Sequence, residues 1–131
     1  MHRKFIMTGA ILGAVAVALG AFGAHGLKRI VAPDTVQVFQ AGVQYQMYHA
    51  IALVLAGVIY ERYTSKLISV AGKLFVLGII LFSGSLYVLT LGKASDLSAL
   101  DRVGMITPVG GICFIAAWMC LFLGVIKKRM L

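Results

Sequence analysis

Four long stretches of the chain carry no charged residue, and short charged segments separate them. The stretches span residues 5–27, 35–60, 74–92 and 103–126, and the connections are 28–33, 61–73 and 93–102. Each stretch is long enough to cross a bilayer as a helix, which takes about 20 residues. A membrane barrel would instead show alternating segments of about ten residues. The pattern predicts an all-α fold in one domain over residues 1–131, an integral membrane four-helix bundle with helices at about 5–27, 35–60, 74–92 and 104–126.

Two of these stretches do not match a single crossing. The second is too long, and its opening is rich in glutamine. We place that opening in the interface and the buried part at about 43–60, so that His49 falls in the first half of the buried part. In the fourth stretch, Thr107 and Pro108 indicate an N-cap and a first helical position. A start near Leu100 with a kink at Pro108 is the alternative.

The first stretch has a rival interpretation as a secretory signal. Residues 2–4 form a charged start, and residues 21–23 offer small side chains near a cleavage point. Against this, the apolar part is longer than in a usual signal, and three further spans follow it. We therefore expect a retained helix.

Small side chains form a stripe along the first stretch. They recur at spacings of three and four, which draws one line down a single face of a helix: Gly9, Gly13, Ala16, Gly20 and Ala24. Helices in lipid pack through close backbone approach at such patterns. The stripe predicts a docking groove for another helix, and from it we place the first helix at the centre of the bundle.

Composition supports a bilayer as the solvent. The chain is 61% hydrophobic and 12% charged, with a formal net charge of +8. The cations flank the apolar runs instead of forming a stripe interleaved with aromatic residues, so they indicate contacts with anionic lipid and no nucleic acid. Four spans would put both termini and residues 61–73 on one side, together with eight of the twelve cations. The positive-inside rule then predicts cytoplasmic N- and C-termini.

With this orientation, the polar residues of the spans are all expected in the outer half of the membrane. They are His25, Gln44, Tyr45, Gln46, His49, Ser83, Ser85, Tyr87 and Thr107. Polar groups cannot face lipid without a large cost, so they have to bond within the bundle or around water. One interpretation is a shallow pocket that opens outward. The alternative is that these groups only tie the helix ends together.

The two cysteines suggest no chemistry. Cys113 and Cys120 are seven residues apart, which puts them about 10 Å apart on one helical face, too far for a disulfide. No cluster of further ligands accompanies them, so packed thiols are expected, with no metal site and no cofactor.

Four blocks of the sequence resemble a known family. They are GAFGAHGL at 20–27, YQMYHA at 45–50, LFSGSLY at 81–87 and ITPVGG at 106–111. In this order they are similar to the small membrane proteins called domain of unknown function 423, which are similar to the transmembrane protein 256 group. The resemblance implies a four-helix, multi-pass protein of the bacterial cytoplasmic (inner) membrane. It implies no settled biochemical role.

The function that we predict is a non-enzymatic one. No nucleophile, base and orienting group stand in a catalytic arrangement along the sequence. We expect a packing component, either a homo-oligomer or an accessory subunit of a membrane-protein partner.

Two alternatives remain open. In a small transporter or channel, the outer polar layer would be a vestibule, and an anionic or neutral solute would meet the amino end of the fourth helix. Proton-coupled export of cations is disfavoured, because all four acids lie in connections: Asp34, Glu61, Asp96 and Asp101. In the second alternative, haem or quinone binds through His25 and His49, expected at one depth on antiparallel neighbours.

Overall fold

The computed structural model describes residues 2–130 of the chain, with side chains as far as Lys127. Its elements are α1 (Arg3–Ala24), the 3₁₀ turn η1 (Leu27–Arg29), α2 (Pro33–Ile59), α3 (Lys66–Gly78), the π-helical turn η2 (Ile79–Ser83), α4 (Gly84–Ala94), the 3₁₀ segment η3 (Ser98–Met105) and α5 (Thr107–Met130). Since α3, η2 and α4 form one continuous helix, four helices are long and apolar enough to cross a membrane. The predicted all-α fold with four candidate spans is confirmed.

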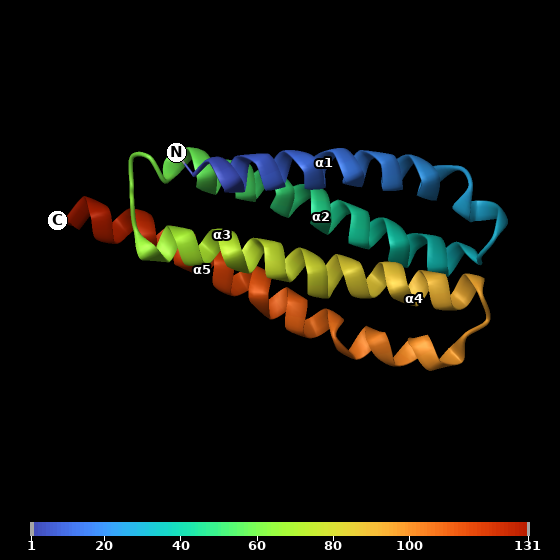
Figure 1. Ribbon diagram of the computed structural model, residues 1–131. Coiled ribbons are helices and arrows are strands. Elements are labelled where there is room, and N and C mark those ends of the chain that lie inside the picture. Colours follow the sequence, from blue (N-terminus) through green and yellow to red (C-terminus); the bar gives the residue numbers. More distant parts are fainter. Residues whose placement is uncertain (1, 131) are drawn as a thin grey trace.

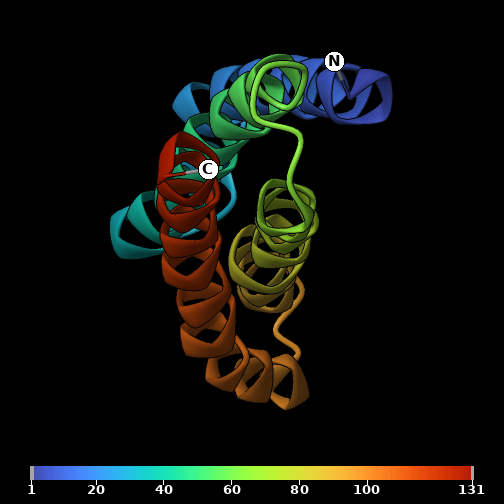
Figure 2. The same ribbon diagram turned by 90° about the vertical axis from the view of Figure 1, so that its left-hand side faces the viewer.

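The helices form two antiparallel pairs that lie side by side. One pair is α1 with α2, and the other is the α3–α4 helix with α5 (Figure 1). Figure 2 shows the two pairs from the end of the bundle where both termini lie. Of the first pair, α2 is the helix that packs against the second pair, through α3, η2 and α4.

The central helix is therefore α2, and our placement of the first helix at the centre is wrong. In the most apolar part of α2, 50% of the residues are buried, against 17% in α1. A stripe of small residues permits close approach to one neighbour, but it leaves the opposite face of the helix uncovered.

The stripe itself packs as predicted, against α2. A Cβ atom added to Gly9 would lie 2.8 Å from the carbonyl oxygen of Ala50, and one added to Gly20 would lie 3.3 Å from Val43. Ala16 is buried in the same interface. At the end of the stripe it is Gly23, one residue before the predicted Ala24, that meets α2.

The third helix begins earlier than predicted. We assigned residues 61–73 to a connection, but α3 starts at Lys66, where the side chain of Ser65 accepts a hydrogen bond of 3.1 Å from the backbone N–H of Leu67. The lysines of this segment misled the prediction, because a helix can continue beyond the hydrocarbon into the headgroup region, where lysine is tolerated.

The π-helical turn η2 was not predicted. It joins α3 to α4 and contacts both α2 and α5. The Ser83 hydroxyl donates to the carbonyl oxygen of Gly42 in α2 at 2.6 Å, and Gly110 of α5 packs on the backbone of Phe82. Such turns are usually single and interrupt an otherwise regular helix.

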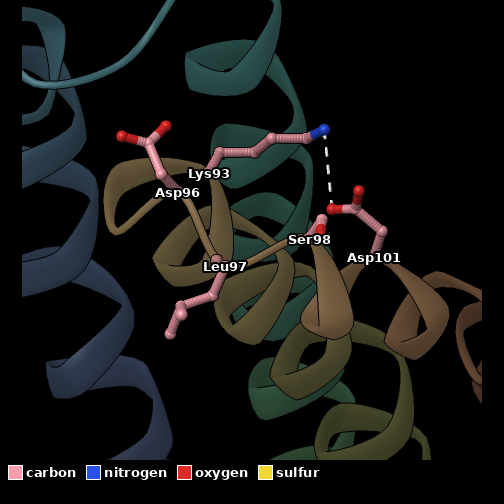
Figure 3. Close-up of a pocket in the computed structure, with 6 residues that line it drawn as sticks. Lys93, Asp96, Leu97, Ser98 and Asp101 are labelled. Carbon is pink, nitrogen blue, oxygen red and sulfur yellow. Dashed lines mark ion pairs between the residues drawn. The ribbon is translucent and has the colours of Figure 1, made fainter.

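The approach to α5 combines our two sequence interpretations. The α-helix begins at Thr107, one residue before Pro108, and η3 precedes it from Ser98. An ion pair of 3.5 Å between Lys93 and Asp101 bridges the turn between α4 and η3. In Figure 3 the Lys93 ammonium points to Asp101, while Asp96 points the other way.

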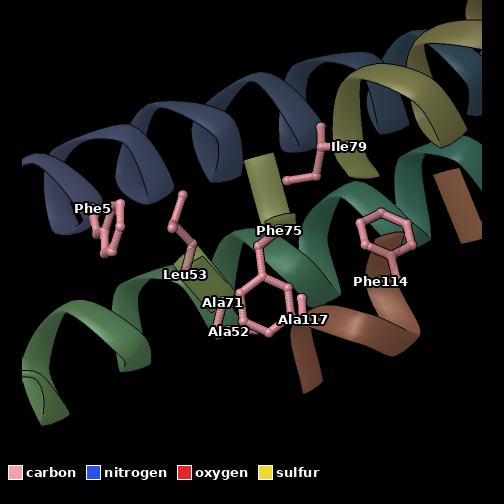
Figure 4. Packing of buried hydrophobic residues seen from close by; sticks show 8 residues of the cluster. All are labelled: Phe5, Ala52, Leu53, Ala71, Phe75, Ile79, Phe114 and Ala117. Atoms are coloured by element: carbon pink, nitrogen blue, oxygen red, sulfur yellow. The ribbon is translucent and has the colours of Figure 1, made fainter. Parts of the chain in front are cut away.

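Two groups of buried apolar side chains hold the bundle together. The larger one, shown in Figure 4, draws on all four spans and consists of Phe5, Ala52, Leu53, Ala71, Phe75, Ile79, Phe114 and Ala117. The smaller one lies between α1 and α2, toward the end of the bundle opposite the termini, and consists of Ala16, Leu27, Val36, Phe39 and Val43. Both depend on small residues that let helix backbones approach each other.

We expect Gly9→Leu to weaken the α1–α2 interface. A side chain at this position meets the backbone of α2, which cannot move aside, and overpacking of this kind typically costs about 1–3 kcal/mol. The free energy of unfolding, measured by denaturant titration in detergent micelles, should fall by that amount. Ala14→Leu is the matched control, since Ala14 is an exposed residue of the same helix; equal losses in the two variants would contradict this packing.

Candidate functional site

Six of the nine predicted polar residues make side-chain hydrogen bonds, and three do not. The bonded residues are Gln46, His49, Ser83, Ser85, Tyr87 and Thr107. His25, Gln44 and Tyr45 are exposed, and no side-chain hydrogen bond to the described residues is recorded for them. The six bonded residues tie neighbouring helices together at three places.

The first tie joins three helices through Gln46. Its Nε2 donates to the backbone carbonyl of Leu12 in α1 at 2.8 Å, and its Oε1 accepts from the Tyr87 hydroxyl of α4 at 2.6 Å. The Gln46 side chain is buried, being 2% exposed. Since both ends of the amide have partners on neighbouring helices, this residue carries no free polar group for a ligand.

The second tie lies around the π-helical turn. Besides the Ser83 contact with α2, the Ser85 hydroxyl donates to the Phe82 carbonyl at 2.8 Å and lies 2.5 Å from the Thr107 hydroxyl. A serine has one proton to donate, so Thr107 is the donor in its contact with Ser85. This links α4 to the first turn of α5.

The third tie joins α2 to α5 through His49. The indole Nε1 of Trp118 lies 3.2 Å from His49 Nε2, and His49 Nδ1 lies 2.7 Å from the Tyr45 carbonyl. An indole N–H can only donate, so Nε2 accepts, and Nδ1 carries the proton that it donates to the carbonyl. The geometry thus fixes a neutral imidazole with both nitrogens engaged. Neither nitrogen is free to bind a metal or to take up a proton from a substrate.

Aromatic rings surround this histidine. His49 stacks on Phe114 with a centroid distance of 3.6 Å and an interplanar angle of 6°, and the ring centroid of Phe75 lies 5.8 Å away. From the sequence, we singled out neither Trp118 nor Phe114 as a partner of His49. The signal that could have pointed to them is His49 itself: a histidine buried within a span needs a hydrogen-bond partner, which a neighbouring helix can supply.

The expected common depth of His25 and His49 is wrong. His49 lies level with the part of α1 between Gly9, whose neighbour is Ala50, and Gly13, whose neighbour is Met47. His25 follows Gly13 by twelve residues, which is about 18 Å of helix, and it caps the far end of α1. The two ligands of one iron have to be within a few ångströms of each other, so these residues cannot form the haem site that we considered.

The polar residues are also not confined to one half of the membrane. Phe75, beside His49, is two residues from Lys73, where the charge-free part of the third span begins, and eighteen from Lys93, where it ends. His49 therefore lies in the half of the bundle that contains the termini, whereas Thr107 lies in the other half. The sequence gives positions along each helix, but it does not show how far neighbouring helices are shifted along each other.

The hollows at the end opposite the termini have different linings from the predicted pocket. One, in Figure 3, is formed by Gly92, Lys93, Asp96, Leu97, Ser98 and Asp101 and has a volume of about 180 Å³. Another of about 370 Å³ is formed by Lys28, Val31, Pro33, Val36 and Gln37. None of the nine predicted residues lines either of these two hollows.

Metal binding has no support in the described part of the chain. No group of three or more His, Cys, Asp or Glu side chains among residues 2–127 stands close enough to hold an ion. Cys113 and Cys120 are free and half-buried.

Comparison with known proteins finds similar membrane proteins in several bacteria. The family described as "Protein of unknown function (DUF423)" matches residues 19–111. The UPF0382 membrane protein YwdK of Bacillus subtilis is 42% identical over 95% of this chain and 98% of its own length. The UPF0382 inner membrane protein YgdD of Escherichia coli is 37% identical over 97% of this chain and 92% of its own. A UPF0382 membrane protein of Haemophilus influenzae is 37% identical over both full lengths.

No solved structure gives a significant match to the chain. The relatives, together with the four candidate spans, identify it as a small multi-pass membrane protein.

The tie through Gln46 can be tested by a double-mutant cycle. Tyr87→Phe removes one hydroxyl and Gln46→Leu removes the amide, so the two changes should lower the free energy of unfolding by less than the sum of their separate effects. Hydrogen bonds between membrane helices average about 0.6 kcal/mol and reach about 1.7 kcal/mol, which is the range expected for the coupling. Tyr48→Phe, at an exposed tyrosine of α2, is the control. A coupling energy of zero in detergent unfolding would show that the bond does not form.

Proposed function

Since the chain belongs to the DUF423 family, we propose that it is a non-enzymatic membrane protein that works by lateral packing, either with copies of itself or as an accessory subunit of a membrane-protein partner. The observation that carries this proposal is how the polar side chains are used. Those buried in the described part of the chain all have hydrogen-bond partners within the bundle. They stabilise the arrangement of the helices, which leaves the outer helix faces as the surfaces for contact with other molecules.

The face of α1 that points away from α2 supports packing against another helix. It exposes Ala10, Ala14 and Ala18 at spacings of four, with larger residues such as Ile11 beside them. This repeats on the outer face the kind of pattern by which α1 docks on α2. The outer face of α5 differs, because it consists of large side chains such as Ile115 and Phe122, which are 67% and 56% exposed.

The bundle offers less support for the other functions that we considered. A general base needs a free nitrogen or oxygen, and both nitrogens of His49 are engaged. A transport pathway needs polar groups that line a continuous hollow, whereas here they bond across helix contacts. Flux is therefore the competing outcome in the test below.

We further propose that both termini lie in the cytoplasm of a bacterium and that the protein resides in its cytoplasmic membrane. The end of the bundle with the termini carries eight cations and one acid, Glu61. The other end carries four cations and three acids. This asymmetry supports the orientation through the positive-inside rule. The name of the Escherichia coli relative, an inner membrane protein, supports the location.

Photo-crosslinking in cells tests the packing role. A benzophenone amino acid at Ala14, on the outer face of α1, should give a discrete protein adduct, at twice the monomer mass for a homo-oligomer or at another fixed mass for a partner. The same amino acid at Leu91, an exposed position of α4, serves as the control and should give lipid adducts only.

The proposal would be wrong if neither position gave a protein adduct and if vesicles containing the purified protein passed ions or small solutes faster than empty vesicles. In that case His49→Ala, compared in the same flux assay, would show whether the α2–α5 tie belongs to the pathway.

Cysteine labelling tests the orientation. Ser95→Cys and Thr64→Cys are placed in a chain in which Cys113 and Cys120 are replaced by alanine; both new positions are exposed, at opposite ends of the bundle. An impermeant maleimide added to spheroplasts should label position 95 alone, and permeabilised cells should label both. If position 64 alone were labelled in spheroplasts, the termini would lie outside the cytoplasm and the proposed orientation would be wrong.

A further inference from the structure

An open hollow of about 440 Å³ lies between the first turns of α1 and the middle of α3, at the end of the bundle that holds the termini. It is lined by His2, Lys4, Phe5, Thr8, Lys73 and Val76. These side chains come from two helices that otherwise touch little, because α1 packs mainly on α2. The hollow therefore marks the gap between the two helix pairs.

One contact brings the two lysines of this hollow together. The Phe5 ring of α1 packs on Gly72 of α3, where any side chain would collide with the ring. Lys4 precedes Phe5 and Lys73 follows Gly72, and the two lysines line the same opening, one from each helix. His2 stacks on Phe5 with ring centroids 3.7 Å apart, which covers the other face of the ring.

The hollow carries positive charge without a partner in the described part of the chain. Both lysines are exposed, and no ion pair with any residue from 2 to 127 is recorded for either. The hydroxyl of Thr8 adds a neutral donor to the lining. Two cations held at one opening repel each other, so an anion bound between them would be stabilised by both.

The depth of the hollow is that of lipid phosphates. Lys73 and Lys93 are the charged residues that border the third span, and they are twenty residues apart, or about 30 Å of helix. The hydrocarbon core of a bilayer is also about 30 Å thick. Lys73 is thus level with the boundary of the hydrocarbon, and Val76, about one helical turn further along the span, lies on the acyl-chain side of it.

We propose that this hollow binds an anionic phospholipid, with the headgroup phosphate between Lys4 and Lys73. The Thr8 hydroxyl donates to a phosphate oxygen, and an acyl chain lies along Phe5 and Val76 into the gap between α1 and α3. The bound lipid then joins the two helix pairs at a place where protein contacts between them are few. A net negative headgroup is favoured over a zwitterionic one, because the opening supplies two positive charges and no carboxylate.

Native mass spectrometry of the purified full-length protein in detergent tests this proposal. Phosphatidylglycerol and phosphatidylcholine with the same acyl chains are titrated separately, and inorganic phosphate is a third ligand. We expect saturable binding of one phosphatidylglycerol. Each lysine near anionic lipid contributes about fivefold in affinity, so Lys4→Gln with Lys73→Gln should weaken that binding by about 25-fold.

Two further double variants control for charge and shape. Lys66→Gln with Lys127→Gln removes the same charge from exposed residues at the same end of the bundle and should change the affinity by less than about twofold. Lys4→Arg with Lys73→Arg keeps the charge and should keep the binding. A measurement on the unaltered protein is independent of all variants: in lipid nanodiscs, solid-state NMR should show the lipid phosphorus close to the Lys73 ammonium and not to that of Lys66.

Several results would overturn the proposal. Equal losses in the two glutamine pairs would mean that the lipid senses only the overall charge of this end. Equal binding of phosphatidylcholine would mean an ordinary annular lipid, and inorganic phosphate as effective as the lipid would mean a site for a free anion. If the Lys4 and Lys73 glutamine pair failed to fold, the absence of the phosphorus contact in the NMR measurement would decide against the proposal.

Discussion

The hydrogen bonds of Gln46 are the interaction around which this bundle is arranged. The buried amide of Gln46 cannot hydrogen-bond to water, so its nitrogen and its oxygen both need partners from the protein. Helices α1 and α4 supply one partner each. A residue that has to satisfy two neighbours can do so only from a helix that lies between them. This requirement agrees with the position of α2 as the central helix and with the high buried fraction of its residues.

The same reasoning explains why the neighbouring polar groups stay within helix contacts. Ser83 reaches the backbone of Gly42, and Trp118 reaches His49, so each contact uses a donor from one helix and an acceptor from another. In soluble proteins such groups could be satisfied by water, and the geometry would be less restricted. In a membrane they define which helices can be neighbours and at what height, even where each bond adds little free energy.

Much of the fold could be predicted from the sequence. Charge-free runs of sufficient length gave the number of spans, and the small side chains of Gly9, Ala16 and Gly20 gave the face on which α1 packs. What the sequence lacked was the relation between helices. Which helix is central depends on burial on several of its sides. The depth of His49 depends on how far α2 is shifted along its neighbours. Neither property produces a periodic pattern in the sequence of one helix.

The candidate site could be predicted only as a set of residues. Gln46, Ser83, Ser85, Tyr87 and Thr107 do form interhelical or local hydrogen bonds, as polar residues of a span must. Their partners could not be predicted, because Leu12 and Gly42 offer backbone carbonyls, which no sequence motif marks. Trp118 was overlooked for a related reason: an indole in a span packs well as an apolar ring, and its single N–H gives no pattern.

The π-helical turn at Ile79–Ser83 has a consequence for the helix that contains it. One additional residue per turn shifts the angular phase of everything that follows by roughly 100°. Before the turn, Gly78 faces Phe114 of α5; after it, Leu86 and Tyr87 face Gly42 of α2. Beyond the turn, a single continuous helix thereby presents to α2 and α5 a different set of side chains from the set that a regular helix would present. A homologue lacking one residue within this turn would carry the same side chains on a regular helix, but those of its second half would point in directions about 100° away.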